Sequence, residues 1–370
     1  MSVPFIELKR FEDGFLDSWN AKVKDLSENT RFIGGPEIEN LEETLRQECG
    51  VSHAIGCANG TDALQLALRG AGVGRGDLVL VPDLTFWATF EAVVNVGADP
   101  VTVDVTEEDL QMDFDLFCKA CKEYKPKAAI LVHLYGWGSA RLEEFRGFAR
   151  ENSIALIEDG AQAYGVTHGG KSIYAGAQVS TISFYPAKVF GAAGDAGAVL
   201  TSDESIAHRV RSLENHGRTT HYSYGLVGWN SRMDSFQAAY LNLSHPHLAA
   251  RLDSRRKSAN VYREKLKDLP LRVVDVPSGY VENGYLNVLI VDQEKRPALE
   301  ARLKEKGIGF GIVYPGPMSA QDASPEYMKG KVGGPVAEKI CKSVLNLPLF
   351  PYMKEAELDE VVAEVRSFFG

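Results

Sequence analysis

The chain has 370 residues, of which 45% are hydrophobic and 24% charged, and its formal net charge at pH 7 is −10. This composition is typical of a globular protein, and the length allows a large core and two domains. The acidic balance, with scattered basic residues, argues against nucleic acid or an anionic membrane as the main partner. The opening stretch "MSVPFIELKRFEDGF" has no apolar signal segment, so we predict a cytoplasmic protein.

Helical patterns alternate with short apolar runs over the middle of the chain. The runs occupy residues 78–82, 100–105, 128–136, 153–159, 179–186 and 197–202. Near-continuous apolar runs are typical of strands buried on both faces, so the pattern predicts a mostly parallel sheet wrapped by helices. Ligands of such sheets bind beyond the carboxyl ends of the strands. The polar residues at these ends are His133, Tyr135, Asp159, Gln162, Ser183 and Lys188.

The sequence pattern changes near residue 245. The stretch "SHPHLAARLDSRRKSANVYREKLKDL" predicts one long, charged amphipathic helix, and shorter strand-like and helical segments follow it. We therefore predict a large α/β domain over residues 1–245 and a smaller α+β domain over residues 246–370.

Five cysteines are present, and they do not suggest a metal site. Cys49, Cys57 and Cys341 stand alone, whereas Cys118 and Cys121 form one C-x-x-C inside the helical stretch "FCKACKEYK". A zinc site would need a second cysteine pair or histidines at ligand spacing. We expect no bound metal.

The stretch "ANGTDALQLAL" is a candidate phosphate site. Gly60 and Thr61 open a helix directly after a strand-like run. The start of a helix exposes unpaired amides and the positive end of the helix dipole, which suit a phosphate. Thr61 or Asp62 could equally be an ordinary helix cap, so the motif alone leaves both interpretations open.

Asp159 ends a buried strand in the motif "IEDGAQAYG". A buried carboxylate is costly unless it is paired, and a protonated pyridine nitrogen is a suitable partner that keeps the ring an electron sink. Gln162 follows three residues later and could reach the phenolic oxygen of the same ring. The alternative is an aspartate that caps the following turn.

Two further motifs complete this interpretation. Phe86 or Trp87, in "PDLTFWATFEA", could stack on a flat ring or pack in the core. Lys188, in "SFYPAKVFGAAGDAGAV", could form a Schiff base with a carbonyl group, and Ser183 could add a hydrogen bond to a phosphate. Together the four elements indicate a pyridoxal phosphate site.

The same motifs carry a family resemblance. The stretches "NGTDAL", "PDLTFWAT", "VHLYGW", "IEDGAQAYG", "SFYPAKVFGAAGDAGAV" and "GWNSRMDSFQAAYL" resemble the successive signatures of the DegT/DnrJ/EryC1/StrS nucleotide-sugar aminotransferases. The resemblance extends from "PFIELKR" to "VLNLPLFPYM", almost the whole chain. It implies a fold-type-I transferase, with a mostly parallel sheet of the seven-stranded type and a smaller α+β domain. It also implies an enzyme that cycles between pyridoxal phosphate and pyridoxamine phosphate.

The resemblance assigns chemical roles to four residues. Lys188 matches the lysine that binds the cofactor covalently and, once released, moves a proton between substrate and cofactor. Asp159 matches the partner of the ring nitrogen, and Gln162 matches the residue that hydrogen-bonds the ring oxygen. Phe86 matches the residue that stacks on the ring.

The remaining cofactor contacts involve the phosphate. Gly60, Thr61 and Ser183 match the residues that surround it. Asn230, in "GWNSRMD", matches an asparagine that reaches the phosphate from a neighbouring subunit. The resemblance therefore implies a homodimer with two shared active sites.

The substrate contacts are less well defined by the motifs. The polar residues that could line the substrate pocket are His133, Tyr135, Tyr185, His216, Arg218 and Tyr314. Relatives often carry "HYP" where this chain has Val313-Tyr314-Pro315, and "HPY" where it has Phe350-Pro351-Tyr352. Contacts made by those histidines would be missing here.

Three rival functions are weaker. Relatives that dehydrate keto-deoxysugars carry histidine at the position of Lys188. A cysteine desulfurase needs a nucleophilic cysteine on a mobile loop, whereas Cys57 and Cys341 lie in apolar runs. A non-enzymatic, cofactor-binding regulator would be expected to show a DNA-binding segment or a basic stripe, and neither is apparent.

The motifs also suggest a substrate. The pattern "G-x-NSR-[LM]-D" is typical of relatives that aminate C3, and "ANGTDAL" resembles those that use UDP-linked 2-acetamido sugars. A uronate would need an arginine partner, and the loop "HGRTTHYSYGLV" offers only Arg218. We therefore favour UDP-3-keto-GlcNAc with L-glutamate as donor, for diamino sugars of a surface polysaccharide or lipopolysaccharide (lipid A or O-antigen). The uronate UDP-3-keto-GlcNAcA and a dTDP- or UDP-linked keto-deoxysugar, aminated at C3 or C4, remain the alternatives.

Overall fold

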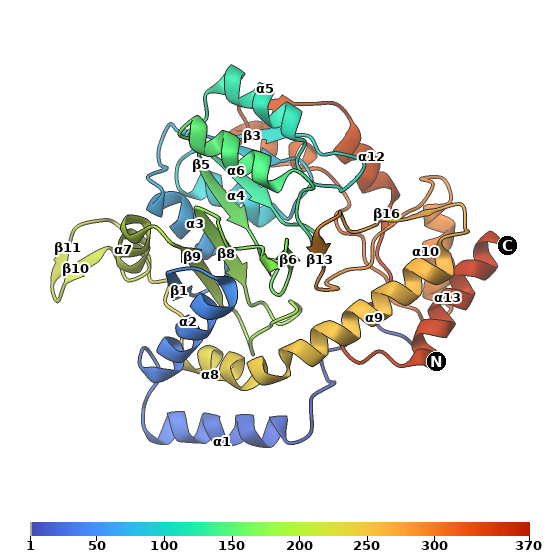
Figure 1. The fold of residues 1–370 in the computed structure, drawn as a ribbon, viewed down its shortest axis with the longest axis horizontal. Helices are drawn as coiled ribbons and strands as arrows, with labels where there is room; N and C mark the ends of the chain where they lie inside the picture. The colour runs from blue at the N-terminus through green and yellow to red at the C-terminus, as the bar shows by residue number, and fades with distance from the viewer. Residues whose placement is uncertain (1) are drawn as a thin grey trace.

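A computed structural model describes residues 2–370, and its centre is one eight-stranded sheet (Figure 1). The strand order is β1-β9-β8-β5-β4-β2-β3-β15. The strands are β1 (His53–Cys57), β2 (Leu78–Pro82), β3 (Asp99–Val103), β4 (Ala128–Val132), β5 (Ala155–Asp159), β8 (Val179–Ser183), β9 (Gly197–Thr201) and β15 (Gly330–Val332). Only β9 runs against its neighbours, β1 and β8. The mostly parallel α/β fold is confirmed, with one strand more than the seven expected.

The apolar runs form strands because both faces of the sheet are covered. Along β2, Val79 and Val81 enter one hydrophobic core while Leu80 enters the other. One core contains residues of α3 (Gly60–Gly70), α4 (Trp87–Asn95), α7 (Glu204–Leu213) and α12 (Val336–Ser343). The opposite core contains residues of α2 (Pro36–Cys49), α5 (Phe114–Tyr124), α6 (Leu142–Glu151) and α8 (Ser235–Ser244). Apolar side chains on both faces of these strands are therefore buried.

The predicted long helix is α9 (Leu248–Leu266), which leads from α8 to the C-terminal part of the chain (Figure 1). There a small sheet of order β12-β14-β16 forms from β12 (Arg272–Val273), β14 (Leu289–Ile290) and β16 (Val344–Leu345). Helices α10 (Arg296–Glu305) and α13 (Glu355–Phe369) supply residues to a third hydrophobic core around it. This small unit is built as the sequence pattern predicts.

The division at residue 245 stays a proposal, and two segments cross it. Near the N-terminus, Val3 forms a parallel bridge with Ile308 and is buried in the core of the small unit. From the C-terminal part, β15 pairs in parallel with β3 and completes the edge of the large sheet. The chain therefore ties the two units together at both ends.

Smaller elements surround these units. A hairpin of β10 (Arg218–Thr220) and β11 (Ser223–Tyr224) extends away from the body beside α7 (Figure 1). The other elements are α1 (Phe15–Glu28), η1 (His245–His247), η2 (Met318–Ala320), α11 (Ser324–Tyr327) and the three-stranded sheet of β13 (Tyr280–Val281), β6 (Thr167–His168) and β7 (Lys171–Ser172). Among the helices of residues 2–370, none combines the length and apolar character needed to cross a membrane.

Candidate active site

A cavity of about 690 Å³ opens beyond the carboxyl ends of β4, β5 and β8. The last residues of these strands, Val132, Asp159 and Ser183, all line it. The predicted cofactor residues that line it are Gly60, Thr61, Phe86, Asp159, Gln162, Ser183 and Lys188. The structure therefore brings together every candidate cofactor residue except Asn230.

The start of α3 forms one wall of this cavity. Asn59 caps the helix, because its side-chain oxygen accepts a hydrogen bond from the Asp62 amide at 2.8 Å. A Cβ atom on Gly60 would lie 2.6 Å from Cβ of Ser183, so only glycine allows the helix to start this close to the end of β8. The first amides of a helix have no intrahelical acceptor. At this position those amides and the Ser183 hydroxyl can bind a phosphate.

Asp159 is a buried carboxylate that forms no ion pair within residues 2–370. Its side chain is 5% exposed. One oxygen accepts a hydrogen bond from the Thr89 hydroxyl at 3.0 Å, and the other accepts one from the Ala161 amide at 3.1 Å. Burial raises the pKa of Asp159 above its usual value. A protonated ring nitrogen would supply the positive charge that this carboxylate lacks.

Gln162 is held in one orientation at the cavity wall. Its side-chain oxygen accepts a hydrogen bond from the Tyr135 amide at 2.6 Å, and its nitrogen donates to the Tyr314 hydroxyl at 3.0 Å. Because the oxygen is already engaged, the NH₂ group is the part available to a ligand. Gln162 can therefore donate a hydrogen bond to a phenolic oxygen.

Lys188 presents an amine that no carboxylate holds in an ion pair within residues 2–370. Its Nζ donates a hydrogen bond to the Tyr285 hydroxyl at 3.4 Å and lies 5.0 Å from the centroid of the Tyr285 ring. The backbone turn before it is closed by the Lys188 amide, which donates to the Tyr185 carbonyl at 2.8 Å. The amine is positioned in the cavity without being neutralised, as a Schiff-base lysine requires.

The two aromatic residues at the start of α4, Phe86 and Trp87, lie in different environments. Phe86 precedes the helix, lines the cavity and is 56% exposed, with its ring centroid 5.8 Å from that of Tyr314. Trp87 instead stacks on Phe90 at 4.8 Å and packs against the core. Phe86 is therefore the residue available to cover a flat ligand.

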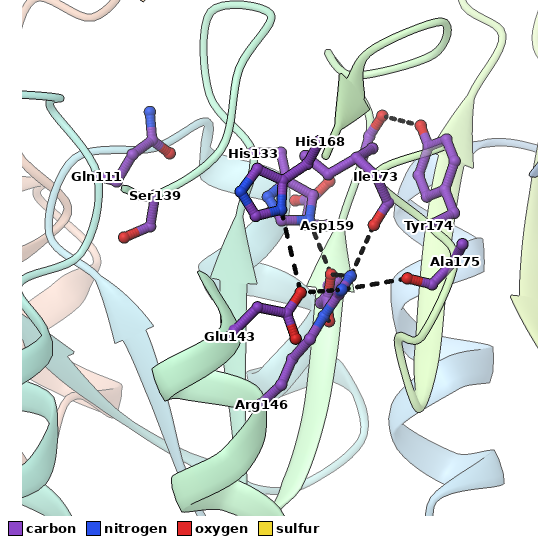
Figure 2. A network of polar contacts seen from close by, with 12 residues as sticks. Gln111, His133, Ser139, Glu143, Arg146, Asp159, His168, Ile173, Tyr174 and Ala175 are labelled. Atoms are coloured by element: carbon purple, nitrogen blue, oxygen red, sulfur yellow. Dashed lines mark hydrogen bonds and ion pairs between the residues drawn. The ribbon is translucent and has the colours of Figure 1, made fainter. Parts of the chain in front are cut away.

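His133 does not lie in the cavity. Its Nε2 atom is 2.9 Å from a Glu158 carboxylate oxygen, and both side chains are buried. Arg146 donates to both oxygens of the same carboxylate at 2.8 Å, and the resulting polar network lies next to Asp159 (Figure 2). The register explains this position: Val132 pairs with Asp159, so the next residue along β4 points to the opposite face of the sheet.

The other candidate substrate residues are divided between two places. Tyr185 and Tyr314 line the cavity, whereas Tyr135 is buried behind it and donates a hydrogen bond to the Val313 carbonyl at 2.7 Å. His216 and Arg218 lie outside the cavity of their own chain, at the hairpin. Of the two positions where family histidines are replaced, Val313 lines the cavity, and Phe350 is in the core of the small unit.

Asn230 is exposed and also lies outside the cavity of its own chain. Its side-chain oxygen accepts a hydrogen bond from Arg232 at 2.8 Å. The role expected for Asn230 needs a second subunit, so it stays a prediction.

The cysteines take no part in this site. Cys57 and Cys341 are buried, do not line the cavity, and have thiol pKa values raised by burial. A nucleophilic cysteine would need the opposite shift. Within residues 2–370, no group of three or more His, Cys, Asp or Glu side chains could hold a metal ion.

Three residues at or near the cavity were not predicted from the sequence. Tyr285 and Arg255 line the cavity, and Thr89 bonds Asp159 from behind it. Thr89, on α4, lies four residues after Thr85, which precedes the helix, and their hydroxyls are 2.9 Å apart. The spacing of these two threonines, one helical turn, could have suggested a polar pair facing the sheet.

The fold and the cavity define a class of protein. The cavity suits pyridoxal phosphate, because it combines a helix start beside a serine, a buried carboxylate and a lysine that is in no ion pair. On a mostly parallel sheet, this combination is typical of a transferase that uses that cofactor. The chain matches the DegT/DnrJ/EryC1/StrS aminotransferase family over residues 17–366 and belongs to that family. It is therefore a pyridoxal-phosphate-dependent aminotransferase of the nucleotide-sugar class.

Curated relatives are similar over nearly their full length. A UDP-N-acetyl-3-dehydro-α-D-glucosamine 3-aminotransferase from Acidithiobacillus ferrooxidans is 36% identical, covering 99% of this chain and 97% of the relative. A dTDP-3-amino-3,4,6-trideoxy-α-D-glucose transaminase from Streptomyces venezuelae is 35% identical (99% and 96%). A UDP-2-acetamido-2-deoxy-3-oxo-D-glucuronate aminotransferase from Pseudomonas aeruginosa is 34% identical (99% and 100%).

Solved structures agree with this assignment. A DegT/DnrJ/EryC1/StrS aminotransferase from Brucella abortus superposes with a TM-score of 0.94 at 34% identity, covering 100% of both chains. The Bacillus subtilis protein NtdA, solved with bound pyridoxamine phosphate, superposes with a TM-score of 0.92 at 27% identity, covering 100% of this chain and 85% of NtdA.

Proposed function

We propose that this aminotransferase acts on C3 of a UDP-linked 3-keto-2-acetamido sugar, with UDP-3-keto-GlcNAc as the favoured substrate and L-glutamate as the donor. The observation that carries the proposal is the agreement of the motif "GWNSRMD" with the names of the three relatives, each of which places the amino or keto group at C3. The chain is 34 to 36% identical to these three relatives, so sequence identity does not decide which of their three sugars it uses. The product would serve diamino-sugar synthesis for a surface polysaccharide or lipopolysaccharide.

The choice of a neutral sugar rests on Arg218, the arginine of the loop that precedes "GWNSRMD". A uronate carboxylate would be best bound by a free arginine. The Arg218 guanidinium is engaged by its own hairpin, where its Nε donates to the Thr220 carbonyl at 3.2 Å and the His221 carbonyl at 3.1 Å. These contacts favour UDP-3-keto-GlcNAc over its uronate, which is the alternative substrate.

The residues of the cavity can divide the cofactor chemistry among them. When bound, pyridoxal phosphate supplies an aldehyde and an electron sink for the carbon that loses a proton. The first amides of α3 and the Ser183 hydroxyl would bind its phosphate. Asp159 would hold a proton on the ring nitrogen, and Gln162 would donate a hydrogen bond to the ring oxygen.

Lys188 would act twice. Its Nζ would hold the cofactor covalently, and as a free amine it would move a proton at the reacting carbon. The Tyr285 hydroxyl, 3.4 Å from Nζ, accepts a hydrogen bond from this amine. Phe86 would cover the ring on its open side.

We also propose a homodimer in which Asn230 completes the phosphate site of the partner. The support is that Asn230 is exposed and lies outside the cavity of its own chain. The neighbouring hairpin region presents Tyr222 and Val227, which are 82% and 84% exposed. Large exposed apolar side chains on a projecting element are typical of a surface that another chain covers.

The reverse reaction tests the substrate. The protein loaded with pyridoxal phosphate is mixed with 2-oxoglutarate and, separately, UDP-linked 3-amino-GlcNAc, its uronate and a 4-amino-6-deoxy sugar nucleotide. We expect glutamate to form fastest from the neutral 3-amino sugar and not to form with Lys188→Ala. A faster reaction of the uronate would select the alternative substrate, and glutamate from only the 4-amino compound would refute amination at C3.

A further inference from the structure

Tyr174 is a buried tyrosine behind the end of β5, and none of the motifs assigns it a role. Its side chain is 1% exposed and does not line the active-site cavity. Its hydroxyl donates a hydrogen bond to the Gly160 carbonyl at 2.9 Å. Burial raises the pKa of Tyr174 well above its usual value, so the hydroxyl keeps the proton that it donates. Tyr174 therefore contacts the backbone directly after Asp159.

This hydrogen bond connects Tyr174 to Asp159 through one peptide group. The Gly160 carbonyl and the Ala161 amide belong to the same planar unit. The carbonyl accepts from the Tyr174 hydroxyl and, at 2.8 Å, from the Ala163 amide. On the other side of the unit, the Ala161 amide donates to one Asp159 oxygen at 3.1 Å. Because the unit is planar, a donor that fixes the carbonyl also fixes the direction of the N–H, and hydrogen bonds in such a chain strengthen one another.

The tyrosine ring and the backbone at Gly160 are in close contact. A Cβ atom on Gly160 would lie 2.2 Å from Cε1 of Tyr174, so only glycine allows the ring to lie this close. The Gly160 amide donates to the Thr181 carbonyl of β8 at 3.0 Å. The peptide unit before Gly160 is thus fixed by the sheet, and the unit after it is fixed by Tyr174 and Ala163.

An arginine holds the loop on both sides of Tyr174. Arg146 donates to the Ile173 carbonyl at 2.6 Å and to the Ala175 carbonyl at 3.1 Å (Figure 2). The same guanidinium donates to both oxygens of the buried Glu158 carboxylate at 2.8 Å. Bidentate pairs of arginine and carboxylate fix geometry as well as adding energy. Arg146 therefore anchors the loop of Tyr174 to Glu158 and so to β5.

We propose that Tyr174 is a positioning residue, which holds the Ala161 amide in contact with Asp159 and so keeps this carboxylate fixed opposite the ring nitrogen of the cofactor. The inference rests on the proposed function, in which Asp159 holds a proton on that nitrogen. Within residues 2–370 the Asp159 carboxylate accepts hydrogen bonds from two donors, the Ala161 amide and the Thr89 hydroxyl. One of these two donors depends on Tyr174.

The test measures the affinity of the cofactor-free protein for two compounds by equilibrium dialysis. The first is pyridoxal phosphate, and the second is its deaza analogue, in which a carbon replaces the ring nitrogen and leaves Asp159 without a partner. Wild type, Tyr174→Phe, Asp159→Asn and the double variant are compared. Tyr262→Phe is the matched control, because the Tyr262 hydroxyl is also buried and also donates to a carbonyl, that of Pro348, at 2.9 Å in the core of the small unit.

We expect Tyr174→Phe to weaken binding of pyridoxal phosphate by about three- to tenfold, the value of one hydrogen bond, and to leave binding of the deaza analogue unchanged. Tyr262→Phe should lower the melting temperature by a similar amount but bind both compounds as wild type does. In the Asp159→Asn background, Tyr174→Phe should cause no further loss, because the two residues act as one unit. Equal weakening with both compounds, or additive losses in the double variant, would indicate a general structural role and overturn the proposal.

Arg146→Lys covers the case in which Tyr174→Phe does not fold. Lysine keeps a positive charge beside Glu158, but it lacks the guanidinium fork that reaches both carbonyls next to Tyr174. A loss of affinity confined to pyridoxal phosphate supports the proposal, and an equal loss for both compounds overturns it.

The Asp159→Asn variant keeps failure of this inference distinct from failure of the proposed function. If Asp159→Asn binds pyridoxal phosphate as tightly as wild type does, the proposed role of Asp159 fails. If Asp159→Asn weakens binding of pyridoxal phosphate alone and Tyr174→Phe weakens neither compound, the role of Asp159 stands and the positioning role of Tyr174 is refuted.

Discussion

Replacing Asp159 with asparagine tests the electronic role of the buried carboxylate. The change keeps the size of the side chain and an acceptor oxygen for the Thr89 hydroxyl, which lies 3.0 Å away. It removes the negative charge that would hold a proton on the ring nitrogen. Losing one charge of a buried pair costs about 3–5 kcal/mol, which corresponds to a rate lower by about 10²–10⁴-fold.

The same substitution should have the opposite effect on the cofactor-free protein. The pKa of Asp159 is raised in the folded state, chiefly by burial, so the ionised carboxylate is less stable there than in the unfolded chain. Near neutral pH, Asp159→Asn removes this unfavourable term. We therefore expect the melting temperature of the cofactor-free variant to equal or exceed that of wild type.

The assay measures glutamate single turnover, covalent cofactor capture by borohydride, and melting temperature in the same preparations. Thr89→Val is the milder control variant, because it keeps the carboxylate and removes only one hydrogen bond to it. The loss of that hydrogen bond to a charged group should cost about 1.5–3 kcal/mol. Turnover like wild type in Asp159→Asn, with the cofactor bound, would refute the role. Equal loss of turnover and of thermal stability would instead indicate a structural defect.

Four other predictions follow from the site and the packing. Lys188→Ala should fold and bind the cofactor only non-covalently, and borohydride fixation of the cofactor to another lysine of the wild type would contradict the assignment. Mixed Lys188→Ala and Asn230→Ala subunits should recover part of the activity in hybrid dimers, and no recovery despite demonstrated subunit exchange would count against a shared site. Gly60→Ala should weaken cofactor binding, measured by equilibrium dialysis, by about tenfold or more, because the new Cβ would lie 2.6 Å from Cβ of Ser183. An unchanged affinity would mean that the start of α3 is not held in place against β8. Glu12 has a pKa lowered to about 2, so its stabilising contribution is present above about pH 4.5 and is lost as the pH falls toward 2. Denaturant titrations across this range should therefore show that the free energy of unfolding of Glu12→Gln falls less with acid than that of wild type.

The sequence was sufficient for the sheet and for the reacting groups. The apolar runs predicted the parallel strands because strands covered on both faces have no polar side to interrupt the pattern. Asp159 and Lys188 could be placed together because the polar residues at the carboxyl ends of neighbouring strands share one edge. The apolar run over residues 128–136 is longer than the strand it forms. β4 ends at Val132, and the chain then turns, with Tyr135 at a φ of 66°.

The wall of the cavity was harder to predict. His133 was expected at the site, yet it faces Glu158 on the other side of the sheet, because alternate residues of a strand point to opposite faces. Arg255 was missed because the helical pattern of "SRRKSAN" does not show which arginine faces the cavity and which faces solvent. Tyr285 was missed because its position depends on how the C-terminal segment packs against α9, which no local pattern encodes.

The edge strand contributed by the C-terminal segment has a consequence for biosynthesis. β3 (Asp99–Val103) must wait for β15 (Gly330–Val332), its partner on that side, until more than 200 further residues have left the ribosome. At ordinary synthesis rates this interval is about 10–40 s. Throughout it the nascent protein displays an unpaired strand edge, which can pair with other growing chains. The long separation in sequence between β3 and β15 thus makes synthesis, before β15 emerges, the stage at which this edge is open to wrong pairing.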